Sequence, residues 1–286
     1  MRRLARLILP LLLAASPATA QPSAVTVPNS EVRVMHARDD GREYRILVAR
    51  PAGAPPPAGF PVLYVLDGNA AFATVAEAVR VQSRRAAATG VAPAVVVGIG
   101  YPTDGPYDET RRIRDFTTPA DPARLPPRPD GSPWPANGGA DAFLRFLVEE
   151  VKPAIARDVP VDRTRDALFG HSLGGLFVLH TLFTRPDAFR AYAAISPSLW
   201  WNDRAILEEE RRFAASSPPS GRRLLIAVGG LERQRNMVDD AEALAARLSA
   251  PGTLQVVQRT FEGENHGSIV PTALSHALRA TLGPVP

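Results

Sequence analysis

The sequence predicts an α/β fold in three layers, with helices on both faces of a mostly parallel sheet. Strand-like and helix-like segments alternate at least five times along the chain, which is the pattern of consecutive strand–helix–strand units. Most of the strand-like runs are continuously apolar, as expected of strands covered on both faces. The pentapeptide Gly170-His171-Ser172-Leu173-Gly174 stands between such a run and a helix-like segment, which places a sharp turn at the end of a strand.

Residues 1–20 show the three parts of a secretory signal peptide. These are a basic start, a short apolar run from Leu7 to Ala15 and a small-residue site at Ala18-Thr19-Ala20. The apolar run is too short to cross a bilayer and Pro10 interrupts it, which argues against a membrane anchor. We therefore expect an exported protein, periplasmic or secreted, whose mature chain of residues 21–286 is a single domain without stable membrane insertion.

The composition is that of an ordinary globular protein, with 45% hydrophobic and 22% charged residues among 286. The absence of cysteine excludes disulfides, thiolate metal sites and a cysteine nucleophile. The net charge is +4, but three arginines lie in the predicted signal peptide, and the remaining chain carries a net charge of +1. The charge balance therefore gives no reason to expect a nucleic acid or an anionic membrane as partner.

The mature chain begins with a predicted β-hairpin, followed by a proline-rich connector and then by alternating strands and helices. Turn-forming residues 38–41 join the two hairpin strands. The continuous apolar runs predict buried strands, and segments of helical periodicity separate them. The expected strands are 31–37, 43–49, 62–66, 94–99, 167–169, 191–195, 224–228 and 254–261, and the expected helices are 70–85, 140–157, 174–184, 203–215, 235–248 and 271–282.

Residues 101–139 interrupt this alternation. The segment contains nine prolines and a cluster of three arginines. A stretch of this length without regular structure is uncommon inside a compact domain and is usually functional. We therefore expect a loop or lid beside a binding site.

The pentapeptide around Ser172 is a G-x-S-x-G motif in the context that a nucleophile elbow requires. In such an elbow the serine occupies a strained turn between a strand and a helix, and the flanking glycines remove side chains that would collide. A serine that merely caps the helix is the alternative. The buried strand before the motif and the amphipathic helix after it favour Ser172 as the nucleophile.

A serine nucleophile needs a base within hydrogen-bond reach, and His266 is the best placed of the five histidines. It follows the last predicted strand in a polar loop, at the sheet edge where catalytic groups of α/β proteins gather. The other four are less suitable. His171 is expected to point away from the serine, His180 to pack in the helix after the elbow, and His36 and His276 to lie in the hairpin and the last helix.

The acid of a Ser–His–acid arrangement is expected after the penultimate strand, where Glu232 follows the run 224–230. Glu262 and Glu264, which neighbour His266 in sequence, could replace it. Asp239 and Asp240 fit a solvated helix face better. An oxyanion hole requires two backbone N–H groups, and we expect these from Leu173 and, in the turn after strand 62–66, from Asn69.

These motifs together resemble the esterase D-type Putative esterase family of α/β hydrolases, and most closely its ferric-siderophore (trilactone) esterases. The resemblance spans residues 30–283, and it implies an α/β-hydrolase fold with Ser172 and His266 as the core pair. In this family the acid is variable or sometimes dispensable. The motifs are Leu63-Tyr64-Val65-Leu66-Asp67-Gly68-Asn69, the elbow, Ser196-Pro197-Ser198-Leu199-Trp200-Trp201-Asn202 and Gly263-Glu264-Asn265-His266-Gly267-Ser268.

Two groups of residues are candidates for substrate binding. Arg111, Arg112 and Arg114 resemble an arginine-bearing segment of the siderophore esterases, and guanidinium groups suit an anionic substrate. Pairing of these arginines with nearby acids is an equally good interpretation. Trp200 and Trp201 are both candidates to line an acyl or aryl pocket, and we expect one of them to do so.

The sequence thus predicts a serine-dependent carboxylic ester hydrolase that works through an acyl-enzyme on a small-molecule ester, with siderophore lactones implied by the resemblance. Neither a metal ion nor an organic cofactor is expected. An acyltransferase could use the same acyl-enzyme. A non-catalytic binding relative is disfavoured because Ser172 and His266 are both present.

Overall fold

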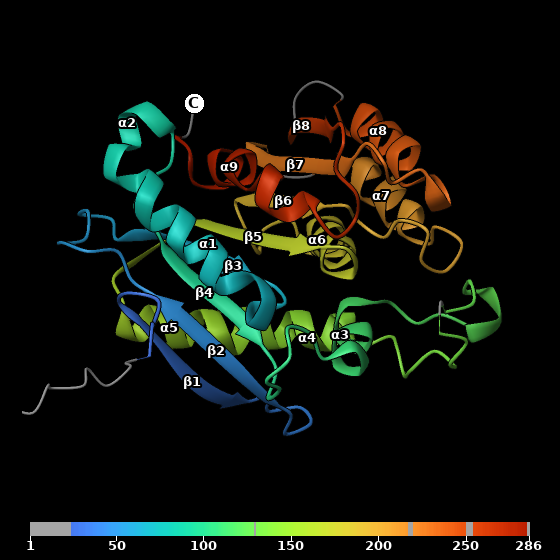
Figure 1. Ribbon diagram of the computed structural model, residues 1–286, viewed down its shortest axis with the longest axis horizontal. Helices are drawn as coiled ribbons and strands as arrows, with labels where there is room; N and C mark the ends of the chain where they lie inside the picture. Colours follow the sequence, from blue (N-terminus) through green and yellow to red (C-terminus); the bar gives the residue numbers. More distant parts are fainter. Residues whose placement is uncertain (1–23, 129, 217–219, 250–253, 285–286) are drawn as a thin grey trace, which may run out of the picture.

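A computed structural model describes residues 24–128, 130–216, 220–249 and 254–284. The predicted signal peptide, residues 1–20, lies outside the described residues. The described chain forms an α/β fold around one eight-stranded sheet (Figure 1). The strands are β1 (Ser30–His36), β2 (Glu43–Ala49), β3 (Phe60–Val65), β4 (Val95–Gly100), β5 (Val161–His171), β6 (Ala191–Ile195), β7 (Arg222–Gly229) and β8 (Leu254–Phe261).

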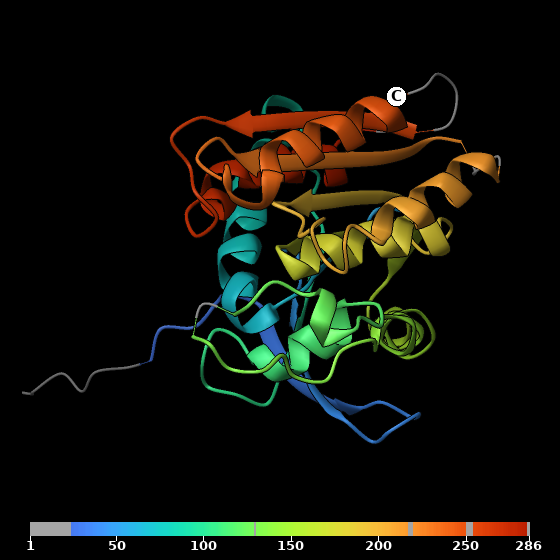
Figure 2. The same cartoon turned by 90° about the vertical axis from the view of Figure 1, so that its right-hand side faces the viewer.

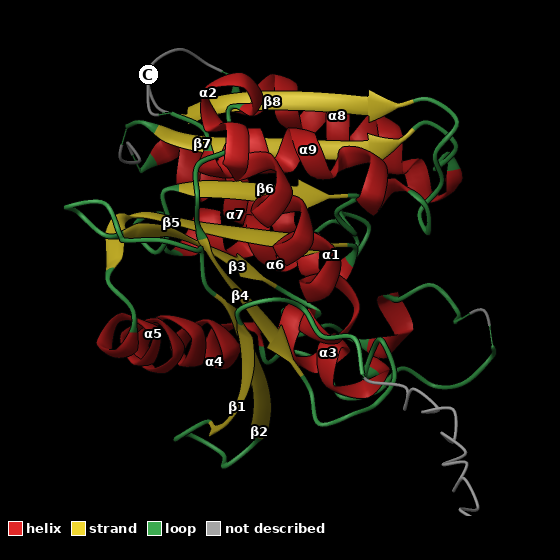
Figure 3. Ribbon diagram, turned by 60° about the vertical axis from the view of Figure 1, so that its left-hand side comes forward, coloured by secondary structure: helices red, strands yellow, loops and turns green. Residues whose placement is uncertain are grey.

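The sheet has the order β1-β2-β4-β3-β5-β6-β7-β8. The hairpin β1–β2 is antiparallel, and β2 pairs antiparallel with β4. All pairings from β4 through β3 to β8 are parallel, which confirms the mostly parallel sheet. Twist accumulates along the sheet, so that β1 and β2 run crosswise to β7 and β8 in Figure 3.

Helices cover both faces of the sheet and create two apolar cores. On one face, α1 (Gly68–Gln82) and α9 (Ile269–Leu282) pack on the inner strands. The opposite face carries the larger core and most of the remaining helices (Figures 1 and 3). Its helices are α3 (Glu109–Phe116), α4 (Ala140–Arg145), α5 (Lys152–Asp158), α6 (Leu173–Thr184), α7 (Ile206–Ala215) and α8 (Met237–Leu248), and the short α2 (Ala86–Thr89) follows α1.

Three helices differ from the sequence prediction in a physically informative way. A π-helical turn, η3 (Phe146–Val151), joins α4 to α5 directly before Pro153, whose ring cannot be accommodated by regular helical bonding. The helix α7 begins at Ile206 rather than at 203, because residues 202–204 have positive φ angles. Residues 235 and 236 also have positive φ angles, and α8 therefore begins at Met237.

The segment 101–139 is more regular than the proline content predicts. Its first part forms α3, whose N-terminus is capped by the Asp108 side chain accepting a hydrogen bond from the Arg111 amide. Asp121 caps the short 3₁₀-helix η2 (Pro122–Arg124) in the same way. The expectation of a structureless loop is therefore wrong for these two stretches, since local capping compensates for the prolines.

The loops that follow the parallel strands meet at one edge of the sheet. Figure 2 shows β6, β7 and β8 ending at the same side of the molecule. The turn after β5, the loop after β7 and the loop after β8 contain Ser172, Glu232 and His266, respectively. Within the described ranges, no helix has the length and apolar character needed to cross a bilayer.

Candidate active site

Ser172 occupies a strained turn between β5 and α6. Its backbone has φ 62° and ψ −119°, a conformation that non-glycine residues rarely adopt. The turn is so tight that a Cβ atom on Gly170 would lie 2.3 Å from the carbonyl oxygen of Gly174. One on Gly175 would lie 2.9 Å from the carbonyl oxygen of Ile195. Only glycine fits at these positions, and the strained turn holds the serine hydroxyl at the sheet edge.

The predicted serine, histidine and glutamate form one chain of hydrogen bonds. The Oγ of Ser172 lies 2.9 Å from Nε2 of His266, and Nδ1 of His266 lies 2.6 Å from Oε2 of Glu232. The three residues come from separate loops. These loops meet because the strands before them are parallel and end at the same edge of the sheet. This geometry allows His266 to accept the serine proton while Glu232 orients the imidazole.

Glu232 is almost enclosed, with 2% of its side chain exposed. Burial opposes ionisation, but hydrogen bonds from His266, from the Ser196 hydroxyl at 2.5 Å and from the Gly229 amide at 2.7 Å outweigh it. The pKa of Glu232 is therefore held below its usual value. The carboxylate stays negatively charged at neutral pH and can stabilise a protonated His266.

Two of the other carboxylates considered from the sequence, Glu264 and Asp240, have different partners. Glu264 accepts hydrogen bonds from Ser268 at 2.5 Å and Thr272 at 2.7 Å. Asp240 lies 2.7 Å from Nε of Arg204. Of the described carboxylates, the one that bonds to His266 is Glu232.

His171 does not have the position that its sequence context suggests. Its ring packs against the ring of His266, with 4.6 Å between the ring centroids. Burial, reinforced by the neighbouring His266 and by Arg112, lowers the pKa of His171 to about 3. His171 therefore stays neutral and packs against the base instead of pointing away from the site.

Two serines after β6 complete the hydrogen-bonded surroundings of Ser172 and Glu232. No role for them was predicted from the sequence. Ser196, with φ 43°, bonds to Glu232, and the Oγ of Ser198 lies 3.4 Å from the Oγ of Ser172. Their position directly after a buried parallel strand is the signal that could have identified them, because such positions gather at the same sheet edge.

The backbone amides expected to hold an oxyanion belong to the first turns of two helices, Leu173 in α6 and Asn69 in α1. Amides in the first turn have no acceptor inside their own helix and are free to bind a developing negative charge. The Asn69 side chain accepts from the Tyr101 amide at 2.7 Å and donates to the carbonyl of Thr103 at 3.0 Å. These bonds fix the turn that presents the Asn69 amide.

A hollow of about 470 Å³ opens beside Ser172 and His266. Trp200 lines it, whereas Trp201 is buried in the core and donates from Nε1 to the Thr118 carbonyl at 3.1 Å. Of the two candidates, Trp200 therefore lines the hollow and Trp201 belongs to the core. The other lining residues are Ser198, Leu231, Glu232, Gln234, Arg235, Met237 and Asn265.

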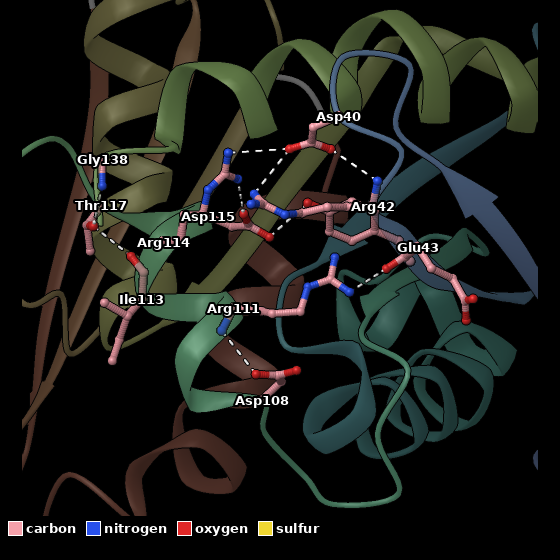
Figure 4. A network of polar contacts seen from close by, with 11 residues as sticks. Asp40, Arg42, Glu43, Asp108, Arg111, Ile113, Arg114, Asp115, Thr117 and Gly138 are labelled. Atoms are coloured by element: carbon pink, nitrogen blue, oxygen red, sulfur yellow. Dashed lines mark hydrogen bonds and ion pairs between the residues drawn. The ribbon is translucent and has the colours of Figure 1, made fainter. Parts of the chain in front are cut away.

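The three arginines of α3 do not line this hollow. Arg111 donates to the Glu43 carbonyl at 2.6 Å, and Arg114 pairs with Asp115 at 3.2 Å and with Asp40 at 3.3 Å. Figure 4 shows both side chains directed toward the hairpin region. Arg111 and Arg114 therefore fasten α3 to the rest of the fold.

Arg112 forms a two-pronged ion pair with Asp67 at 2.9 and 2.8 Å. Both side chains are nearly enclosed, with exposures of 7% and 6%. Asp67 has φ 51° and directly precedes the Gly68–Asn69 turn. For Arg112, the structure therefore supports the alternative interpretation, in which the arginines pair with acidic residues of the protein. The Arg112–Asp67 pair braces the backbone near the candidate oxyanion site.

The sequence of the chain is similar to those of known esterases. The sequence profile described as "Putative esterase" matches residues 39–267. The ferri-bacillibactin esterase BesA of Bacillus subtilis is 46% identical over 268 residues, covering 92% of each chain. The siderophore triacetylfusarinine C esterase of Aspergillus fumigatus is 36% identical, with 90% of this chain and 94% of that protein covered.

Two solved structures of relatives have a similar fold. The crystal structure of the BES protein from Bacillus cereus superposes with a TM-score of 0.87 at 42% identity, covering 93% of this chain and all of that one. The siderophore hydrolase EstA of Aspergillus nidulans gives a TM-score of 0.77 at 36% identity, with 92% and 97% of the two chains covered. The expected resemblance and the α/β-hydrolase type of fold are confirmed, and the chain belongs to the Putative esterase family.

Proposed function

We propose that this protein is a serine esterase that hydrolyses the ester bonds of siderophore-type lactones. The observation that carries the proposal is the unbroken hydrogen-bond chain from Ser172 through His266 to Glu232. The substrate class rests on relatives named for siderophore esters, which cover nearly the whole chain. An ester hydrolase of this type needs a nucleophile, a base and an oxyanion site, and we assign these roles to Ser172, to His266 and to the amides of Leu173 and Asn69.

The proposed reaction begins when Ser172 Oγ attacks the ester carbonyl while His266 Nε2 takes its proton. Negative charge then develops on the carbonyl oxygen, where the Leu173 and Asn69 amides stabilise it. His266 returns the proton to the departing alcohol, which leaves an acyl group on Ser172. Water attacks the acyl-enzyme with His266 again acting as base, and the free acid is released.

Export remains part of the proposal and is supported by the sequence of residues 1–20 alone. N-terminal sequencing of the protein recovered from outside the cytoplasm would test it. A mature N-terminus near Gln21 is the expected result.

The function itself is tested with a ferric catecholate trilactone and a neutral aryl ester, with the products identified by mass spectrometry. We expect the trilactone to yield linear fragments whose summed mass exceeds that of the trilactone by one water for every bond cut. A fluorophosphonate probe should label Ser172. An acyltransferase would instead give the acyl group attached to an added alcohol acceptor at the expense of hydrolysis. Failure to cleave the trilactone while the aryl ester is hydrolysed would contradict the substrate class.

A further inference from the structure

We infer that Arg235, held against Trp200, is the residue that recognises an anionic group of the substrate beside Ser172. The inference deepens the proposed function and rests on it, because the recognised group belongs to the ester that Ser172 attacks. Arg235 and Trp200 both line the hollow that contains Ser172 and His266. Arg235 lies in the loop between Glu232 and α8.

The first support is the stacking of the two side chains. The guanidinium carbon of Arg235 lies 4.2 Å from the centroid of the Trp200 ring. A cation over an indole face is attracted by the negative face of the ring. The stacking leaves the N–H donors at the rim of the guanidinium available to a ligand. Trp200 is itself supported by Trp134 and Trp201, at ring-centroid distances of 6.2 and 6.0 Å.

The second support is charge. Within the described ranges, no ion pair joins Arg235 to a carboxylate, whereas the neighbouring Arg204 is paired with Asp240 at 2.7 Å. Partial burial lowers the pKa of Arg235, without an acidic side chain to offset it. Glu232, the carboxylate that lines this hollow, is already engaged by His266. An anionic substrate group would therefore meet an unneutralised guanidinium.

The third support is the backbone. Arg235 has φ 56° and ψ 23°, and the next residue, Asn236, has φ 54°. Two consecutive non-glycine residues in the left-handed region are energetically costly. Such a conformation persists only where the surroundings impose it, and it is commonly found at ligand sites. Here it ends the loop before α8 and directs the Arg235 side chain onto Trp200.

A second hollow, of about 500 Å³, shares Trp200 and Arg235 with the first. Its other wall includes Arg124 and Leu125 of the segment 101–139. The stacked pair thus stands between the space at Ser172 and an adjoining space. A substrate with several equivalent arms could place one arm on each side, with its anionic groups near Arg235.

The experiment compares Arg235→Gln with Arg233→Gln, its matched control. Arg233 is an exposed arginine of the same loop that does not line the hollow. Each variant is assayed with two aryl esters that share a leaving group, one with a neutral acyl chain and one with a terminal carboxylate. A hydrogen bond to a charged group is stronger than one between neutral groups. We therefore expect Arg235→Gln to lower the anionic-to-neutral ratio of kcat/KM at least tenfold, through KM.

The control and the salt series complete the design. Arg233→Gln should leave the anionic-to-neutral ratio within twofold of the parent value. Rising salt should lower the ratio in the parent protein but not in Arg235→Gln, because screening acts on the same contact. An unchanged ratio in Arg235→Gln, or an equal loss in Arg233→Gln, would overturn the inference alone. Failure of the parent protein to hydrolyse either ester would overturn the proposed function as well.

Discussion

Two charged regions of the molecule contrast in how their polar groups are satisfied. In α3, two of the three arginines form ion pairs within the fold, Arg112 with Asp67 and Arg114 with Asp115. Around Ser172, the hydroxyl of the nucleophile and the guanidinium of Arg235 face a hollow. The same residue type, arginine, therefore serves the fold in one region and is available to a ligand in the other.

Backbone strain is concentrated around the hollow, although Asp67, the partner of Arg112, also has a positive φ angle. Ser172, Ser196 and Arg235 all have positive φ angles and lie around the hollow, whereas the residues of α3 have regular helical structure. Strain and unsatisfied polar groups lower stability, and they are retained where chemistry needs them. Substitutions near Ser172 should consequently reduce turnover with little loss of stability, and those near α3 should do the reverse.

The largest effect is expected for Ser172→Ala. Removing the nucleophile should lower kcat by a factor on the order of 10⁶, by analogy with serine proteases. The free energy of unfolding should change by less than about 1 kcal/mol, since the hydrogen-bond partners of the hydroxyl among the described residues are His266 and Ser198. Hydrolysis of an aryl ester and urea denaturation measure the two quantities. Turnover that survives the substitution would refute the assignment of the nucleophile.

The next effect is expected for Glu232→Gln, which keeps the size of the side chain and removes its charge. A carboxylate that orients and stabilises the imidazolium should contribute a factor of about 10³ to 10⁴ in kcat. Glu264→Gln is the control, because Glu264 is near His266 in sequence but bonds to Ser268 and Thr272. A loss of only a few-fold in Glu232→Gln would indicate a Ser–His pair that works without an acid.

The sequence predicted the groups at the carboxyl edge because chain order and strand direction determine what gathers there. Ser172, Glu232 and His266 each follow a parallel strand, and no other information is needed to bring them together. The roles of these groups remain predictions, since geometry alone does not measure catalysis. The mostly parallel sheet was predicted because strands and helices alternate along the chain.

Side-chain pairing between distant segments could not be predicted in this way. Arg112 and Asp67 are 45 positions apart, and an arginine-rich helix looks the same in sequence whether it binds a ligand or an internal carboxylate. A role for Arg235 could not be predicted, because its position at the hollow depends on a left-handed turn. Glycine or asparagine would indicate such a turn in the sequence, but arginine does not. Helix α3 was missed because local capping compensates for its proline-rich neighbours.

The paired region provides the third prediction, in which Arg112→Gln should destabilise the fold. Breaking a buried ion pair leaves an uncompensated carboxylate at Asp67 and costs about 3–5 kcal/mol. The double variant Arg112→Gln/Asp67→Asn should recover part of this loss, because it removes the stranded charge. Arg211→Gln, which breaks an exposed pair with Glu208 at 2.6 Å, should cost less than about 1 kcal/mol. Equal losses for Arg112→Gln and Arg211→Gln in urea denaturation would contradict the structural role.

The smallest effect is expected from His180, another paired group remote from the hollow. Burial opposes its protonation, but hydrogen bonds to Asp141 and Glu209 outweigh burial and raise the pKa of His180 to about 9. Because the folded-state pKa exceeds the unfolded value of 6.5, protonation stabilises the fold fully below pH 6.5. This stabilisation, of at most about 3 kcal/mol, is lost as the pH rises through 9.

His180→Gln tests this linkage through the pH dependence of the unfolding free energy between pH 6 and pH 10. The parent protein should lose stability relative to the variant across this range, so that the two curves converge as the pH rises. His36→Gln, at an exposed position in β1, should give a curve parallel to that of the parent. Parallel curves for His180→Gln as well would mean that Asp141 and Glu209 do not hold a proton on His180. His180 would then contribute to stability through packing rather than through its charge.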